Sequence, residues 1–203
     1  MASTPVYPVT VVGELDPSLS RWLWLIKWLL LIPHFVVLVF LWLAYLGLTV
    51  VAFLAILFTG RYPRGIFDFN VGILRWTWRV AFYSYSALGT DRYPPFSLHS
   101  RDYPANLEVE YPEQLSRGLV LVKWWLLALP HYIITAVFQG GLGPRYGGLN
   151  TILVFFAAIM LLFTGRYHQD IFQLILGINK WVIRVTVYAS LMRDEYPPFR
   201  LGD

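Results

Sequence analysis

The chain has 203 residues, of which 57% are hydrophobic and only 14% are charged, and its formal net charge is +4. Soluble domains average about 45–50% apolar and about 25% charged residues, so this composition indicates an integral membrane protein. The absence of cysteine excludes disulfides, thiolate metal sites and cysteine nucleophiles. The positive balance suits anionic lipid headgroups, whereas no basic run or recognisable binding fold favours nucleic acid.

One pattern of residues occurs twice along the chain. It consists of basic anchors, a Pro-His pair, the pentapeptide Phe-Thr-Gly-Arg-Tyr, a basic residue followed by tryptophan, and Tyr-Pro-Pro-Phe. A duplication this long predicts a module of half the chain that is used as a pseudo-symmetric pair. The predicted domains are a first repeat at 1–102 and a second repeat at 103–203.

The first long apolar run, 22–58, contains Lys27 as its single fixed charge. As one helix it would extend about 55 Å, far beyond a hydrocarbon core of about 30 Å. The second copy carries eight extra residues here, in a glycine-rich stretch at 139–150, and such backbone cannot face lipid. We therefore expect an all-α membrane protein with a transmembrane helical hairpin in each repeat, at 20–59 and 117–164.

Each hairpin has two predicted arms. They are 20–44 with 46–59, and 117–138 with 150–164. In this topology 15 of the 16 lysines and arginines lie on one face, and Arg145 is the exception. The positive-inside tendency makes that face cytoplasmic and places both termini there, in a multi-pass protein of a cytoplasmic membrane.

A third helical pattern follows each hairpin, at 65–88 and 168–191. Its polar residues fall on one stripe at helical spacing. They are Asp68, Gly72, Arg75, Arg79 and Ser86 in the first copy, and Gln173, Gly177, Lys180 and Arg184 in the second. A narrow polar stripe on an apolar cylinder is typical of an amphipathic interfacial helix in the headgroup layer. It also fits a membrane span whose stripe faces the interior of a bundle.

Short segments of alternating polar and apolar residues surround these helices. They are 5–12, 95–98, 107–110 and 198–201. Proline biases the residue before it toward extended geometry, so Tyr-Pro-Pro-Phe favours an extended start. We expect short cytoplasmic β-strand pairings that join the end of one repeat to the start of the other.

Basic residues recur at equivalent positions and form the candidate binding sites. A pair of them opens each hairpin, where long stems reach phosphate level beside interfacial tryptophans. One arginine follows the glycine of each Phe-Thr-Gly-Arg-Tyr, where glycine ends a helix and arginine complements its negative end. With the third helices they would form two basic clusters for anionic lipid or an acidic partner loop. The candidate lipid- or partner-binding residues are Arg21, Lys27, Arg61, Arg75, Arg79, Arg117, Lys123, Arg166, Lys180 and Arg184.

The two Pro-His pairs lie inside the apolar runs. The simplest interpretation is a proline kink with a histidine bonded to a neighbouring helix. The alternative joins His34 and His131 across the pseudo-symmetry axis, as an intramembrane polar pair for a proton or a metal. Two imidazoles without nearby carboxylates are a weak metal constellation, and no catalytic motif is present. We therefore predict no metal, no cofactor and no catalytic residue.

Four stretches of the first copy stand out as a set. They are Leu-Leu-Leu-Ile-Pro-His at 29–34, Phe-Thr-Gly-Arg-Tyr-Pro-Arg-Gly at 58–65, Leu-Arg-Trp at 74–76 with Arg79, and Asp-Arg-Tyr-Pro-Pro-Phe-Ser-Leu at 91–98. Both repeats resemble a bacterial membrane family known as domain of unknown function 4389, although His168 replaces a proline in the second copy. The resemblance implies a bacterial cytoplasmic membrane. It implies no activity and no catalytic residues.

Three functions are compatible with these patterns. The leading hypothesis is a non-enzymatic accessory or scaffolding subunit of a larger membrane complex, with membrane lipids and other membrane subunits as its partners. The first alternative is membrane shaping, since overlong hairpins beside amphipathic helices resemble the layout of reticulon-like proteins. The second is a small transporter or channel component with a polar path. That path would be lined by His34, His131, Arg75 and Arg184, but the scarcity of intramembrane polar residues disfavours it.

Overall fold

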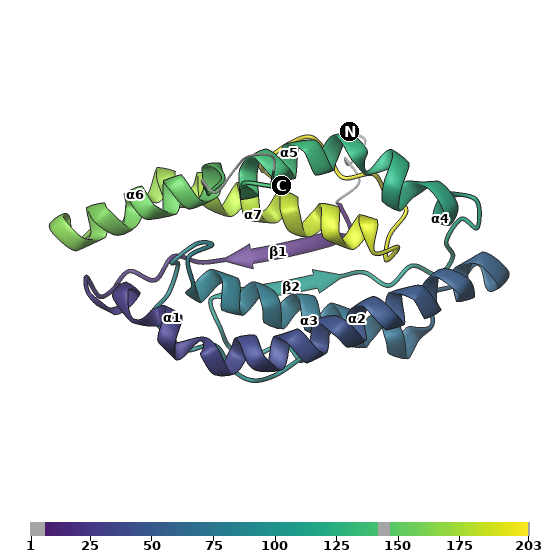
Figure 1. The fold of residues 1–203 in the computed structure, drawn as a ribbon, viewed down its shortest axis with the longest axis horizontal. Coiled ribbons are helices and arrows are strands. Elements are labelled where there is room, and N and C mark those ends of the chain that lie inside the picture. The colour runs from purple at the N-terminus through teal and green to yellow at the C-terminus, as the bar shows by residue number, and fades with distance from the viewer. Residues whose placement is uncertain (1–6, 142–146, 203) are drawn as a thin grey trace, which may run out of the picture.

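The computed structural model describes residues 7–141 and 147–202, and its elements recur in pairs (Figure 1). The first repeat contains β1 (Val9–Gly13), the 3-10 turn η1 (Leu23–Leu25), α1 (Lys27–Leu30), α2 (Ile32–Thr59) and α3 (Arg64–Tyr83). The second contains β2 (Ala105–Val109), α4 (Leu119–Val122), the π-helical turn η2 (Lys123–Leu127), α5 (Leu129–Gln139), α6 (Leu149–Thr164) and α7 (Gln169–Ala189). The described chain is thus mostly helical with one two-stranded sheet.

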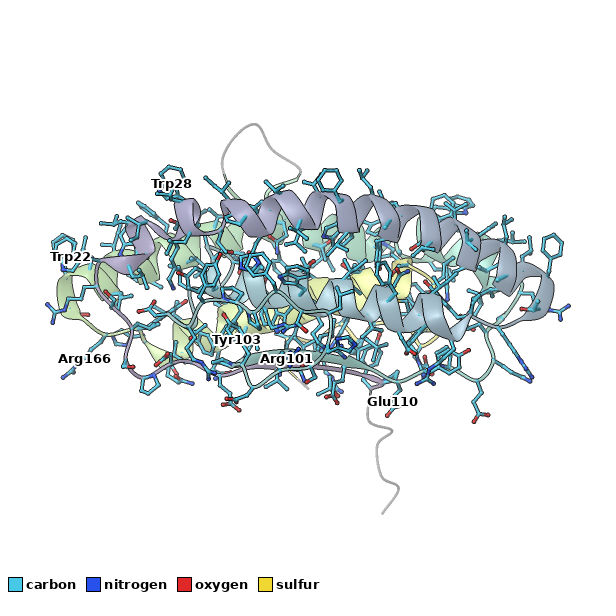
Figure 2. All side chains as sticks on the ribbon, turned by 90° about the horizontal axis from the view of Figure 1, so that it is seen from below. Trp22, Trp28, Arg101, Tyr103, Glu110 and Arg166 are labelled. Atoms are coloured by element: carbon cyan, nitrogen blue, oxygen red, sulfur yellow. The ribbon has the colours of Figure 1, made fainter. Side chains whose placement is uncertain are left out.

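The elements are stacked in layers, which Figure 2 shows from the side. α2 lies on one face, α3 and α7 run through the middle, and the sheet lies on the opposite face. The strands and the long helices all run roughly along the longest dimension of the molecule (Figure 1). The helical layers extend over most of the length of the protein, whereas the five-residue strands cover only its middle.

The sheet pairs β1 with β2 in antiparallel register, with Val9 opposite Val109. Alternation along each strand buries one set of side chains under α3 and α7 and leaves Thr10 and Glu108 exposed. The predicted strand pairing is therefore confirmed. It joins the starts of the two repeats, however, and not the end of one to the start of the other.

The predicted hairpin of the first repeat is wrong, because α2 is continuous across the expected turn. Gly47, which lies next to that turn, is in mid-helix, where a glycine costs only about 1 kcal/mol relative to alanine. The apolar run is divided at Leu31 instead, between α1 and α2. Pro33 begins α2 and does not kink it, since the first helical turn needs no N–H from that residue.

The insert of the second repeat does interrupt the helix, as the glycines predicted. α5 ends at Gly140, whose φ of 87° is left-handed, and α6 begins at Leu149. Within this connection, residues 142–146 lie outside the described residues, and Arg145 is among them. The break alone does not decide whether α6 turns back along α5.

Contacts to α7 show that α6 does not turn back, so the second predicted hairpin is also wrong. Phe138, near the end of α5, packs edge-on against Trp181 with the ring centroids 5.7 Å apart. Asn150, at the start of α6, accepts a hydrogen bond of 3.3 Å from Asn179. Both contacts lie near the middle of α7, and from there α6 continues away from α5 (Figure 1), so the two helices follow one another along α7. Together they are the interrupted equivalent of α2.

The third helices are present, as α3 and α7, and the arginines of their polar stripe are bonded within the protein. Arg75 donates to the carbonyl of Leu98 at 3.0 Å and to that of Leu107 at 2.8 Å. Arg79 donates to the carbonyls of Ser97 and His99, at 2.6 and 3.0 Å. These bonds hold the segment after Tyr-Pro-Pro-Phe against the helix, which explains why 95–98 and 198–201 are not strands. The placement of these helices relative to a membrane stays a prediction.

Two described helices, α2 and α7, are long and apolar enough to cross a membrane. The bent pair formed by 119–127 and α5 would make a third if its bend of 40° lies within one span. α7 is largely covered by the rest of the protein, whereas only 17% of the most apolar part of α2 is buried. α2 therefore offers most of its surface to the surroundings.

Candidate membrane-facing surface

α2 buries only a narrow stripe of its circumference. The buried residues are His34, Leu38, Tyr45, Ala52 and Ile56. The remaining sides are apolar and open, with Phe40 68% and Val50 61% exposed. A helix that is apolar all round needs an apolar environment on every side, so the open sides of α2 fit lipid and not water.

Most large hydrophobic side chains that are exposed in the described residues lie in 22–58 and 121–163. We call this set the candidate membrane-facing surface, for short the membrane-facing surface; most of it belongs to η1, α1, α2, α4, η2, α5 and α6. Its exposed tryptophans are Trp22, Trp28, Trp124 and Trp125, a residue type that gathers at membrane–water interfaces. Figure 2 shows Trp28 on the α2 side and Arg101 and Glu110 on the opposite side.

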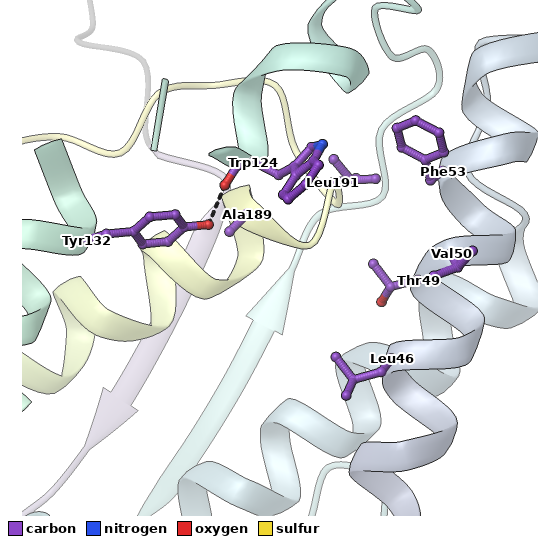
Figure 3. Close-up of a pocket in the computed structure, with 8 residues that line it drawn as sticks. All are labelled: Leu46, Thr49, Val50, Phe53, Trp124, Tyr132, Ala189 and Leu191. Atoms are coloured by element: carbon purple, nitrogen blue, oxygen red, sulfur yellow. Dashed lines mark hydrogen bonds between the residues drawn. The ribbon is translucent and has the colours of Figure 1, made fainter. Parts of the chain in front are cut away.

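A shallow groove between the two repeats interrupts this surface (Figure 3). It has a volume of about 460 Å³ and apolar walls. Its lining residues are Leu46, Thr49, Val50, Phe53, Trp124, Tyr132, Ala189 and Leu191. The Tyr132 hydroxyl donates to the carbonyl of Trp124, so its polar atom is satisfied within the wall. The groove thus extends the apolar environment between α2 and α5.

The two histidines lie in separate aromatic clusters. Trp76 donates its indole N–H to Nδ1 of His34 at 3.1 Å, and the imidazole stacks on Phe96 with centroids 3.9 Å apart. The second copy repeats this: Trp181 donates to His131 at 3.0 Å. The interpretation of a histidine bonded to a neighbouring helix is therefore confirmed. The Pro-His, basic-Trp and Tyr-Pro-Pro-Phe motifs are repeated because they meet in one cluster per repeat.

This arrangement does not form the polar pair of the alternative hypothesis. Each histidine is bonded to a tryptophan of its own repeat, and no group of three or more His, Cys, Asp or Glu side chains in the described part of the chain is placed to hold a metal. Arg184 donates to the carbonyl of Gly202 at 3.0 Å, as Arg79 does to its own loop. The histidines and Arg184 of the alternative polar path are thus bonded within the protein.

Lys27 and Lys123 were predicted to reach lipid phosphates, but both are buried to 1% exposure. Lys27 Nζ lies 2.9 Å from Asp91 Oδ1 and donates to the carbonyl of Thr90 at 2.7 Å. Lys123 Nζ makes the equivalent ion pair with Asp194 at 2.6 Å. Burial lowers the pKa of Lys27, and the carboxylate of Asp91 opposes that shift. These ion pairs fasten the end of each repeat to its beginning.

The arginines of α3 and α7 are also engaged within the protein. Burial, assisted by the nearby charge of Arg75, lowers the pKa of Arg79 to about 10, so the guanidinium stays charged at neutral pH. Lys180 is half-buried on α7.

Of the ten candidate binding residues, four are exposed and have no ion pair or side-chain hydrogen bond among the described residues. They are Arg21, Arg61, Arg117 and Arg166.

These four arginines gather at the two ends of the molecule, in pairs drawn from both repeats. Gly60 and Gly165 end α2 and α6 with φ of 70°, which confirms the predicted helix stops. The guanidinium of Arg117 lies near Gly60, where an added Cβ would be 3.5 Å from its Nε. Arg21 lies still closer to Gly165. Each long helix therefore ends against the first basic residue of the other repeat.

Residues 21–97 and 120–200 each match the family described as a domain of unknown function (DUF4389). None of the curated proteins and none of the solved structures compared with the chain is similar to it. The two matched ranges contain both aromatic clusters and both buried ion pairs. The chain belongs to the DUF4389 family and carries its domain in two tandem copies.

Proposed function

We propose that the protein is a non-enzymatic membrane protein that lies flat in one leaflet and serves as an accessory or scaffolding subunit there. α2, and α5 with α6, would lie parallel to the membrane plane with their apolar sides in the hydrocarbon. The sheet would face the aqueous side and present its polar surface to other subunits. This arrangement replaces the multi-pass topology expected from the sequence.

The observation that carries the proposal is the position of the polar sheet relative to α2. The strands run along the same long dimension as α2, on the opposite face (Figures 1 and 2). If α2 crossed the bilayer, the exposed Glu108 and Arg101 would lie at hydrocarbon depth. A charged side chain at the membrane centre costs about 2.5–3.5 kcal/mol on insertion scales. Lying flat avoids this cost and still covers the exposed apolar residues of α2.

The ends of the described chain support one aqueous side. The hydroxyl of Tyr7 donates to the carbonyl of Glu195 at 3.4 Å, so the beginning and end of the chain lie together. The positive-inside tendency, applied to the excess of lysines and arginines, favours the cytoplasmic face of a bacterial cytoplasmic membrane for both termini.

Depth measurements along α2 test the orientation. The chain has no cysteine, so single cysteines can be placed at Val36, Leu43 and Val50, which are exposed on one side of the helix at seven-residue spacing. Their spin labels should report the same depth in lipid bilayers, and a label at Thr10 should be in water. A crossing helix would instead spread these three positions over about 21 Å of depth, which would reject the flat orientation.

The scaffolding role is tested by purification from native membranes in gentle detergent or lipid particles. A discrete set of membrane subunits should co-purify with the wild-type protein. Substitution of Thr10 and Glu108 by arginine, on the outer face of the sheet, should release them without unfolding the protein, because both side chains are exposed. A protein that is always solitary would contradict the scaffolding role and leave the orientation unaffected.

Membrane shaping is a second candidate, and the one-sided membrane-facing surface favours it. Insertion of two long helices into one leaflet expands that leaflet relative to the other and promotes curvature. Reconstituted liposomes should form tubules or small vesicles as protein density rises. A variant with Phe40→Gln and Leu43→Gln, both on the open side of α2, should lose this activity; liposomes unchanged by dense wild-type protein would exclude it.

A further inference from the structure

One polar pocket lies at the junction of the two repeats. It has a volume of about 380 Å³, and its lining residues are Thr59, Gly60, Arg61, Gln114, Leu115 and Arg117. Half of them belong to the end of α2 and half to the start of the second repeat. Leu115 donates its backbone N–H to the carbonyl of Gly60 at 2.8 Å, which joins the two walls. The pocket therefore exists only because the repeats meet here.

The charge of this pocket is not neutralised by its own walls. Arg61 and Arg117 are both exposed, and neither guanidinium has a carboxylate partner among the described residues. The nearby Arg64, by contrast, is bonded to Asp68 at 3.1 Å. The lining contains no acidic residue, and Gln114 adds a neutral amide. Two like charges facing one small space are stabilised by an anion between them.

The pocket also lies at the boundary of the membrane-facing surface. Phe58, the last large residue of α2 before the pocket, is 73% exposed. An apolar side chain followed within one turn by arginines matches the change from hydrocarbon to headgroups across a leaflet. A phosphate carried by a lipid would be at this level when the protein lies flat.

We propose that the Arg61–Arg117 pocket binds a phosphate group, with the two guanidiniums as its charged donors, and that an anionic phospholipid supplies it. Guanidinium groups match phosphate oxygens with paired N–H donors, which a lysine ammonium cannot do. Soluble phosphate has the same chemistry and is the alternative source. At the other end, Arg21 lies beside Gly165 as Arg117 lies beside Gly60. The proposal depends on the flat membrane placement proposed above.

Vesicle flotation of the full-length protein tests the pocket. Vesicles of phosphatidylcholine, with and without phosphatidylglycerol, are the probes. Arg61→Gln with Arg117→Gln should weaken binding to phosphatidylglycerol vesicles about 25-fold, at about fivefold for each arginine, and should leave binding to phosphatidylcholine vesicles unchanged. Arg61→Lys with Arg117→Lys keeps the charge and should recover only part of the affinity.

A matched control removes the same charge elsewhere. Arg101→Gln with Arg200→Gln changes two exposed arginines outside the pocket and should keep the wild-type affinity. Equal losses in this control, or full recovery by the lysine variant, would overturn the pocket, because net charge alone would then explain binding. Wild-type protein that floats with neither vesicle would instead contradict the flat membrane placement.

Inorganic phosphate distinguishes the two sources of the ligand. Calorimetric titration of inorganic phosphate in the absence of vesicles measures the soluble ligand directly. Phosphate binding that is lost in the Arg61→Gln, Arg117→Gln variant, with unchanged binding of that variant to phosphatidylglycerol vesicles, would assign the pocket to soluble phosphate and overturn the lipid source. Loss of vesicle binding in that variant supports the lipid source, and loss of neither would overturn the pocket.

Discussion

Val11 of β1 is paired directly with Leu107 of β2, and the two residues occupy the same position in their repeats. They are 96 positions apart, the same offset that separates Arg21 from Arg117. Strand pairing of equivalent residues places a pseudo-two-fold axis at this pair. The neighbouring backbone hydrogen bonds follow the same symmetry. The N–H of Glu14 donates to the carbonyl of Pro104 at 2.9 Å, and the N–H of Glu110 donates to the carbonyl of Pro8 at 3.0 Å.

The contribution of this pair to the stability of the core can be measured at Leu107, which is fully buried. Leu107→Ala leaves a cavity beneath α3 and α7 and should lower the free energy of unfolding in detergent by about 2–5 kcal/mol. Val12→Ala, on the exposed side of β1, is the control and should change it by less than about 0.5 kcal/mol. Equal effects would mean that the sheet is not packed on the helices as described.

The buried ion pair of Lys27 with Asp91 predicts a strong asymmetry between single and double variants. Asp91→Asn leaves the buried ammonium without its counter-charge and should cost about 3–5 kcal/mol of unfolding free energy. Lys27→Met combined with Asp91→Asn removes both charges and should recover much of that loss. Denaturant unfolding of Asp91→Asn, of Lys27→Met and of the double variant gives the coupling energy, and additive losses would argue against a direct pair.

The hydrogen bond between Trp76 and His34 predicts a similar asymmetry between single and double variants, in a pair that carries no charge. Trp76→Phe leaves Nδ1 of a buried imidazole without its donor and should cost about 1–3 kcal/mol. His34→Phe combined with Trp76→Phe removes both polar groups and should be less destabilising than the sum of the single variants. The thermal midpoints of the four proteins provide the comparison. Because the cluster is structural, these variants should not alter ion flux across reconstituted vesicles.

The two glycines that end α2 and α6 form a matched pair. Alanine at either position must adopt a left-handed conformation, which costs about 1–2 kcal/mol. At Gly165 the new methyl group would also meet the Arg21 guanidinium, 2.5 Å from its nearest atom, whereas at Gly60 the nearest atom is 3.5 Å away. Both variants should lose similar stability. Only Gly165→Ala should also displace Arg21 and weaken binding to phosphatidylglycerol vesicles.

Local rules predicted much of this fold from the sequence. Glycine after Phe-Thr marked both helix ends, because only a residue that tolerates positive φ fits there. The periodicity that predicted 65–88 and 168–191 located α3 and α7. The alternating residues at 5–12 and 107–110 located the strands, and Tyr7-Pro8 recurs as Tyr103-Pro104, a further signal of their equivalence.

The hairpins failed for a different reason. Their prediction measured the length of 22–58 against the thickness of a bilayer, which assumes that the helix crosses it. The sheet on the opposite face, which no local pattern in 22–58 reveals, removes that assumption.

The candidate site was only partly predictable, because charge alone does not distinguish a buried ion pair from a lipid contact. Lys27 and Arg21 both open the first repeat, yet one is bonded to Asp91 and the other is exposed. The signal that separates them is an acidic residue that recurs together with the basic one. Asp91 and Asp194 occupy equivalent positions in the two repeats, as the lysines do. Arg21 and Arg117 have no such repeated acidic partner.

Because each long helix ends against the first basic residue of the other repeat, neither half is complete by itself. A protein with one copy could close both ends only by forming a homodimer with the same two-fold axis. Such a dimer would have to carry any helix break twice. Covalent fusion removes that constraint, so α2 stays whole while 140–148 interrupts its equivalent. The tandem chain can therefore change one side of its pseudo-symmetric fold without changing the other.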